Sequence, residues 1–228
     1  MNPGKKFLSD LKLHSDYLRW IDSENRYETW EEAIDSIVDQ HRTKYAGIDI
    51  EEELKMFESY AKQKKVLASQ RNLQWRGDGI FSKNARIFNC TSTYCDRPEV
   101  FKQIMYLLLC GCGVGYSVES RFINKLPSIK TRKDTAINFH IGDSIEGWSE
   151  AIDVLMDSFF KGGPTIRFIY SNIRPKGSLV AGRFLAPGPE PLKMAIEKIE
   201  RILESKPNGD KLTSLECHDI ICHIADSV

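Results

Sequence analysis

Residues 86–118 read RIFNCTSTYCDRPEVFKQIMYLLLCGCGVGYSV, and this stretch decides the fold. The short apolar run 86–90 predicts a buried strand, and the strongly apolar segment 101–110 predicts a helix. The glycines after it end that helix, and residues 115–118 predict a second strand. A strand, a helix and a strand in this order are typical of an α/β unit with parallel strands.

The same alternation continues toward the C-terminus. The predicted elements are a helix that starts near Asp143 and ends before Gly162, a strand over 165–171, and two helices near 190–205 and 214–227. The polar stretch 128–142 and the Gly/Pro-rich stretch 174–191 predict loops between these elements. The whole pattern favours an α/β fold with mainly parallel strands.

The N-terminal part is different, because it is polar and helical in its periodicity. Thr29 and Glu32 form a capping box before apolar residues at helical spacing, and Asp49 and Glu52 repeat that signal before a second helix. We therefore expect an N-terminal helical region at 1–66 and an α/β part at 67–228.

Charge and hydropathy exclude some classes of protein. Lys and Arg together number 32, as do Asp and Glu, so the net charge is zero and gives no support to nucleic-acid binding. No apolar run reaches the ~20 residues that span a bilayer, and the first 20 residues are too charged for a signal peptide. We expect a cytoplasmic protein without a membrane partner.

The six cysteines include no CxxC pair, so neither a zinc ribbon nor a thioredoxin motif is indicated. The repeat Cys217-His218 and Cys222-His223 lies in an apolar helical pattern, and its spacing matches no common zinc site. We interpret it as helix packing and expect no metal there.

Three segments between strands and helices are candidate sites. Asn89-Cys90 ends the first predicted strand, so Cys90 is either a packing residue or a redox thiol that faces a pocket. Cys95 is its competitor, because it lies near a predicted helix start. The turn Cys110–Gly115 either reverses the chain tightly or lets a ligand approach the backbone; its helix-to-strand order is the reverse of the order in dinucleotide-binding folds.

The third segment is Ile173–Gly177, directly after a predicted strand. Arg174 and Lys176 flank a proline there, and two cations on a stiff loop suit a phosphate ligand. The alternative is a solvated basic turn. Composition and periodicity by themselves point to no reaction.

Taken together, the segments resemble the ribonucleotide reductase catalytic subunit, most closely the monomeric adenosylcobalamin-dependent type. The matching segments are NARIFNC, MYLLLCGCGVGYSVE, DSIEGWSEAIDVLMDSFF, SNIRPKG, APGPEPL and HDIICHIADSV, in the order of the family. They cover residues 84–228. The resemblance implies a helical N-terminal region followed by the first half of a ten-stranded α/β barrel.

The resemblance also implies roles. Cys90 corresponds to the first of two cysteines that reduce the ribose and become a disulfide, which an external dithiol then reduces. Asn89, Gly113 and Gly115 would line the pocket for the ribonucleotide substrate. The cofactor would be adenosylcobalamin.

Effector nucleotides would bind elsewhere. Arg174 and Lys176 fall on the first specificity loop of the family, which binds the effector phosphates. Asp96 lies near an effector-ribose position, although we prefer a helix N-cap role for it. The polar stretch before DSIEGW is shorter than the insertion of the monomeric members, which puts normal effector control in doubt.

Parts of the family's machinery are not in this sequence. The radical-bearing cysteine of the Asn-Pro-Cys-Gly-Glu motif and the second redox cysteine are both missing. We therefore expect the polypeptide to continue, or a C-terminal part to act as partner. The alternative is a non-catalytic nucleotide-binding or regulatory module with the same fold. A radical-cysteine motif in the neighbouring reading frame would distinguish the two.

Overall fold

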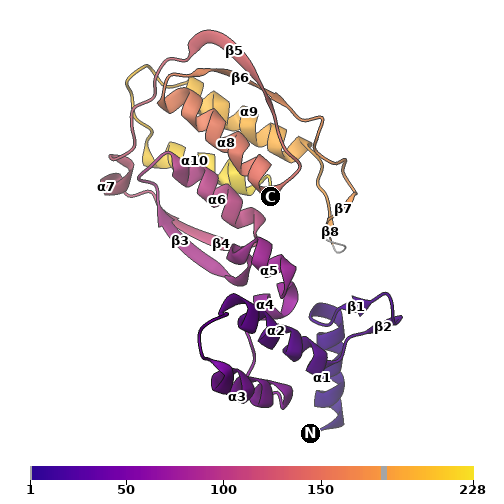
Figure 1. Cartoon of the computed structure of the whole chain (residues 1–228). Coiled ribbons are helices and arrows are strands. Elements are labelled where there is room, and N and C mark those ends of the chain that lie inside the picture. The colour runs from indigo at the N-terminus through magenta and orange to yellow at the C-terminus, as the bar shows by residue number, and fades with distance from the viewer. Residues whose placement is uncertain (1, 181–183) are drawn as a thin grey trace. The chain divides into compact units, whose positions relative to one another are not determined.

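The computed structural model describes residues 2–180 and 184–228, and the chain forms two compact units (Figure 1). The first unit extends to Asn89 and the second runs from Cys90 to Val228. The expected boundary after residue 66 lies inside the first unit, because residues 67–89 cluster with the helices before them. The functional division at residue 66 stays a prediction.

The first unit is mainly helical, in line with the sequence. Its elements are α1 (Pro3–Asp16), a short antiparallel hairpin of β1 (Trp20–Ile21) and β2 (Arg26–Tyr27), α2 (Trp30–Lys44), α3 (Glu51–Lys62), α4 (Gln70–Trp75), α5 (Asp78–Ser82) and a 3₁₀ turn (Asn84–Ile87).

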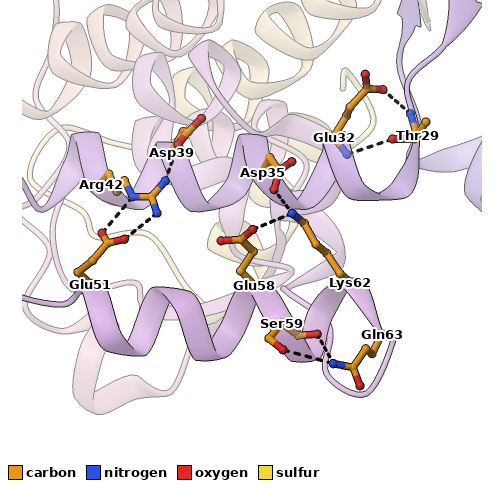
Figure 2. Close-up of polar contacts among 10 residues, drawn as sticks. All are labelled: Thr29, Glu32, Asp35, Asp39, Arg42, Glu51, Glu58, Ser59, Lys62 and Gln63. Carbon is orange, nitrogen blue, oxygen red and sulfur yellow. Dashed lines mark hydrogen bonds and ion pairs between the residues drawn. The ribbon is translucent and has the colours of Figure 1, made fainter.

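The start of α2 is where the sequence predicts it. The backbone N–H of Glu32 donates to the Thr29 hydroxyl at 3.2 Å, and the Thr29 N–H donates to the Glu32 carboxylate at 2.7 Å. These bonds complete a capping box (Figure 2). The indole N–H of Trp30, the first residue of the helix, donates to the Ala61 carbonyl at 2.9 Å and so ties α2 to α3.

The predicted cap of α3 is wrong. Its N-cap is Ile50, which makes no side-chain cap, so Asp49 does not serve as one. Leu54 and Ala61 of α3 pack in one buried cluster with α2 residues. Partly exposed ion pairs also bridge the two helices, Arg42 to Glu51 at 2.9 Å and Lys62 to Asp35 at 2.6 Å (Figure 2).

The second unit contains two strand–helix–strand units and a helical C-terminal part. Its elements are β3 (Cys90–Tyr94), α6 (Glu99–Leu109), β4 (Gly113–Ser117), α7 (Ser120–Ile123), β5 (Lys133–His140), α8 (Ile145–Phe160), β6 (Pro164–Ile169), β7 (Leu179–Val180), β8 (Phe184–Leu185), α9 (Glu190–Glu204) and α10 (Ser214–Ala225). The pairs β3–β4 and β5–β6 are parallel, as the alternation predicted, whereas β7 and β8 pair in antiparallel fashion.

A helical layer links these two parallel pairs. α8 packs on β6, α6 packs on β4, and α6 and α8 pack on each other, while α9 and α10 complete the layer (Figure 1). The apolar sides of these helices form one buried cluster, with Phe101 and Met105 of α6 and Leu155 of α8 among its members. The chain is therefore mixed α/β, with its main core between the two sheets.

Two predictions about strands are wrong. Residues 86–90 do not form a strand, since a 3₁₀ turn occupies 84–87 and β3 begins at Cys90, where the predicted strand ended. Residues 128–142 are not all loop, because β5 lies within them. Seven of the eight β5 residues are exposed, and the segment is too polar to be recognised as a strand from its sequence. It forms a strand because its backbone pairs with β6.

The long loop predicted at 174–191 contains the antiparallel pair β7–β8; residues 181–183 lie outside the described residues. The helix near 143–161 is confirmed as α8, although its cap is Ser144, which accepts a bond from the Gly147 N–H, and not Asp143. The two closing helices are also confirmed. None of the described helices has the length and apolar character to cross a bilayer.

Candidate functional site

The candidate site is the open face of the β3–β4 pair. In the register of this pair, Cys90 lies beside Gly113 and Ser92 lies beside Gly115. All four residues are exposed, whereas the alternating residues of both strands are half-buried. The structure thus brings Cys90 together with both predicted pocket glycines on one face lined by small residues.

Cys90 and its competitor lie in opposite environments. Cys90 is a free, exposed thiol on the open face. Cys95 is fully buried, and burial raises its pKa to about 11, with the nearby Asp96 charge acting in the same direction. Because the thiolate is the nucleophile and reductant, these environments favour Cys90 as the reactive residue.

The glycines of this segment have two different uses. Gly111 has a φ of +84° and makes the turn from α6 into β4, as the tight-turn interpretation expects. Gly115 has no positive φ, and a Cβ built on it would lie 3.7 Å from the Thr91 carbonyl oxygen, an ordinary contact. Neither backbone nor packing requires glycine at 115, so its effect is to leave space above the sheet.

Asn89 directly precedes Cys90 and ends the first unit. It is exposed, and its side-chain oxygen accepts a bond from Arg71 Nε at 3.3 Å. The guanidinium therefore fixes the oxygen of the amide and leaves the amide NH₂ as the end that can donate to a ligand.

The predicted phosphate loop lies on the other sheet, after β6. Arg174 Nε donates to the Asp143 carboxylate at 2.7 Å, and Arg174 Nη1 donates to the Leu179 carbonyl at 3.3 Å. Lys176 is exposed, and its backbone approaches Gly188, where a Cβ would come within 3.0 Å of the Lys176 nitrogen. The loop is therefore held in place, and an anion at Arg174 has to compete with Asp143.

Asp96 does not cap α6, so the role that we preferred for it is wrong. The N-cap of α6 is Pro98, which makes no side-chain cap. The Asp96 carboxylate instead accepts a bond from Arg97 Nη1 at 2.7 Å. A ligand that uses Asp96 would have to share it with this neighbouring guanidinium.

Ser92 is a residue of this face that the sequence interpretation missed. Its signal is the spacing of two from Cys90, which places both side chains on one side of a strand. Tyr94 continues the same side, 53% exposed, and stacks on Phe122 of α7 with 4.3 Å between ring centroids. No three His, Cys, Asp or Glu residues converge as a metal site in the part of the chain that the structure describes.

Comparisons with known proteins give relatives of one kind. No protein-family model matches the chain. It is 24% identical to the adenosylcobalamin-dependent ribonucleoside-triphosphate reductase of Lactobacillus gasseri, over 93% of this chain and 38% of that protein. It is 36% identical to a probable adenosylcobalamin-dependent ribonucleoside-triphosphate reductase of Dictyostelium discoideum, over 36% of this chain and 11% of that protein.

A solved structure shares the fold. It is a B12-dependent, class II ribonucleotide reductase, with a TM-score of 0.82, 21% identity, and coverage of 95% of this chain and 40% of that one. These comparisons confirm the resemblance drawn from the motifs. The chain spans about two fifths of the length of the Lactobacillus protein and of the solved structure. The alignment with the Lactobacillus protein runs over 289 positions, whereas this chain has 228 residues. Within the matched region, the Lactobacillus protein therefore has additional residues that this chain lacks.

Proposed function

We propose that this chain is the N-terminal part of an adenosylcobalamin-dependent ribonucleotide reductase and that Cys90 is one of the two thiols that reduce the ribose. The observation that carries the proposal is the free, exposed Cys90 beside Gly113 on the open β3–β4 face. A thiol beside Ser92 and the two glycines is accessible to a sugar ring and to a second thiol. The similarity to the class II reductases supports the same assignment.

The chemistry needs a dithiol. Removal of the ribose 2′-hydroxyl as water consumes two electrons and two protons, which two thiols supply while they become one disulfide. Cys90 would be one of them, and the other would come from the rest of the enzyme. An external dithiol would then reduce the disulfide and restore both thiols.

The remaining predicted residues have supporting roles in this proposal. The Asn89 amide NH₂ would donate to the substrate, and Gly113 and Gly115 would let the nucleotide approach the sheet. Arg174 and Lys176 would hold the phosphates of an effector nucleotide, with Arg174 exchanging its bond to Asp143 for one to phosphate. Asp96 would contact the effector ribose only if it is released from Arg97.

The cofactor would be adenosylcobalamin, bound mainly by the part of the enzyme outside this chain. The nucleotide occupies the open face above Cys90 in this proposal, so no described residue of this chain is assigned to holding the cofactor. When bound, it supplies the radical that starts the reaction. The two parallel strand pairs would belong to the first half of a ten-stranded barrel, which the C-terminal part of the reductase would complete.

The test is reconstitution with a C-terminal reductase part that carries the radical cysteine. We expect deoxynucleotide formation from ribonucleotide, adenosylcobalamin and dithiothreitol only when both parts are present. Complex formation and nucleotide binding without any turnover would contradict the proposal and favour a non-catalytic nucleotide-binding module. Turnover by this chain alone would contradict the need for a second part.

A further inference from the structure

A second thiol has a different set of neighbours, on the covered side of the same sheet. The repeat that the sequence showed at 217–223 brings His218 and Cys222 together, since residues four apart share a face of α10. His218 Nε2 lies 3.5 Å from Cys222 Sγ. His218 Nδ1 lies 2.8 Å from the hydroxyl of Tyr116, which comes from β4.

The arrangement has the order of a thiol, a base and a group that orients the base. The imidazole can accept the Cys222 proton at Nε2 while Nδ1–H donates to the Tyr116 oxygen. Burial, with the neighbouring Cys222 next, raises the Tyr116 pKa to about 12. Tyr116 therefore remains a neutral phenol near pH 7, fixing the ring without introducing a charge.

Access distinguishes this thiol from its neighbour on the helix. Cys222 is half-buried and His218 is exposed, so a small reagent can reach the pair. Cys217, five residues before Cys222, is fully buried, and burial raises its pKa to about 12. One helix thus carries an accessible thiol beside a base and an inaccessible thiol in the core, which makes Cys217 an internal control.

The pair is separate from the candidate site. Tyr116 and Val114 project from β4 toward the helices, where both pack on the main core cluster, whereas Gly113 and Gly115 belong to the open face. Cys222 therefore lies across the sheet from Cys90, and nothing in the proposed ribose chemistry uses it. Two side chains also fall short of the four ligands of a structural zinc site.

We propose that Cys222 is a second reactive thiol of this protein, modified by low-molecular-weight disulfides, with His218 as its base and Tyr116 as a positioning residue. The Cys222 proton passes to His218 Nε2, and the sulfur attacks one sulfur of the small disulfide. The S–S bond breaks, a mixed disulfide forms on Cys222, and the departing thiolate takes the proton from His218. Cys222 is oxidised and half of the reagent is reduced to a thiol.

The test is the rate at which oxidised glutathione modifies each cysteine of the native chain at pH 7, followed by mass spectrometry of peptides. We expect Cys222 to react roughly tenfold faster in the wild type than in His218→Ala. This factor is smaller than the ~100-fold rate increase that a general base gives in a closed enzyme site, because the Cys222–His218 pair is partly exposed. Tyr116→Phe keeps the ring and should slow Cys222 by a smaller factor. Cys217 should remain unmodified in the folded wild type and in both folded variants.

Denaturant separates the proposed role from ordinary exposure. In 8 M urea the Cys222 rates of the wild type and both variants should become equal, because the positioning is lost. Equal native rates in wild type and His218→Ala, with both chains folded by circular dichroism, would overturn the proposal. A rate difference that persists in urea would overturn it as well, since the folded arrangement could not then be its cause.

Discussion

The two faces of the β3–β4 pair are built from the same two strands and have opposite chemistry. One face is open and carries Cys90, Ser92, Gly113 and Gly115. The other is covered by helices, and the chain buries Cys95 completely on leaving β3. Cys95 directly follows β3, and its N–H still donates to the Ser117 carbonyl of β4 at 3.0 Å, so the strand pattern extends to it. Five positions is an odd spacing, which sends Cys90 and Cys95 to opposite sides.

This contrast shows that position on the strand, more than the immediate sequence, decides what a cysteine can do here. The open face leaves a thiol accessible beside glycines that give it room. The covered face removes water and keeps the thiol protonated, with a pKa raised to about 11 by burial. The proposed redox role of Cys90 can therefore be tested with the same substitution at Cys95 as a control.

The largest expected effect comes from Cys90→Ser in the reconstituted enzyme. Serine keeps the size and polarity of the side chain but cannot form a disulfide, so turnover with an external dithiol should fall to background. Substrate binding, measured by equilibrium dialysis with a labelled ribonucleotide, should change little. The assay compares this variant with Cys95→Ser under identical conditions.

Cys95→Ser is the matched control, because it makes the same change on the covered side. It should keep turnover per folded molecule, although a hydroxyl buried in an apolar core destabilises the fold by about 1–3 kcal/mol. If Cys90→Ser keeps near-normal turnover and Cys95→Ser loses it, the assignment of the reactive thiol is wrong.

A smaller effect is expected from the pH dependence of stability. In the folded chain the Cys95 pKa is about 11, whereas the ordinary value is 9.0. The unfolded chain therefore loses this proton first, so the contribution of Cys95 to the free energy of unfolding is complete below pH 9 and is lost as the pH rises toward 11. Over this window the wild type should lose on the order of 2 kcal/mol more than Cys95→Ala. Urea unfolding followed by circular dichroism at pH 8, 9, 10 and 10.5 measures the difference. If the free energies of unfolding of the two proteins fall in parallel as the pH rises, Cys95 is not protected from ionisation.

The smallest expected effect is that of Gly115→Ala on the open face. The added methyl meets only ordinary contacts, so the free energy of unfolding should change by less than about 0.5 kcal/mol. The same methyl projects into the space proposed for the nucleotide, and we expect about a tenfold rise in KM. Ser92→Ala serves as the control, because it removes volume from this face. An unchanged KM in Gly115→Ala would place the substrate elsewhere.

The sequence predicted helices better than strands, for physical reasons. Thr29 and Glu32 are a local signal, and the structure contains the capping box they indicate. The strand at 86–90 was misplaced because Ile87 and Phe88 are apolar, whereas the true strand CTSTY is polar on one face and half-buried on the other. Strand pairing depends on distant partners, which local composition does not reveal.

The candidate site was predicted in part. The pairing of Cys90 with Gly113 required the parallel register of β3 and β4, which the strand–helix–strand order allowed but did not fix. The ion pair of Arg174 with Asp143, 31 positions apart, could not be seen at all from the loop's own residues. The bond between Tyr116 and His218 spans 102 positions and depends on how α10 packs.

The alternation along β3 also bears on how this segment can change in evolution. Loss or gain of a single residue between Cys90 and Cys95 shifts the register by one and exchanges the faces of every side chain beyond it. Substitutions at Thr91 or Thr93 preserve that parity, whereas one-residue indels do not. Descendants of this gene should therefore carry substitutions within the segment CTSTYC but keep its length. Where the length does change, it should change by two residues.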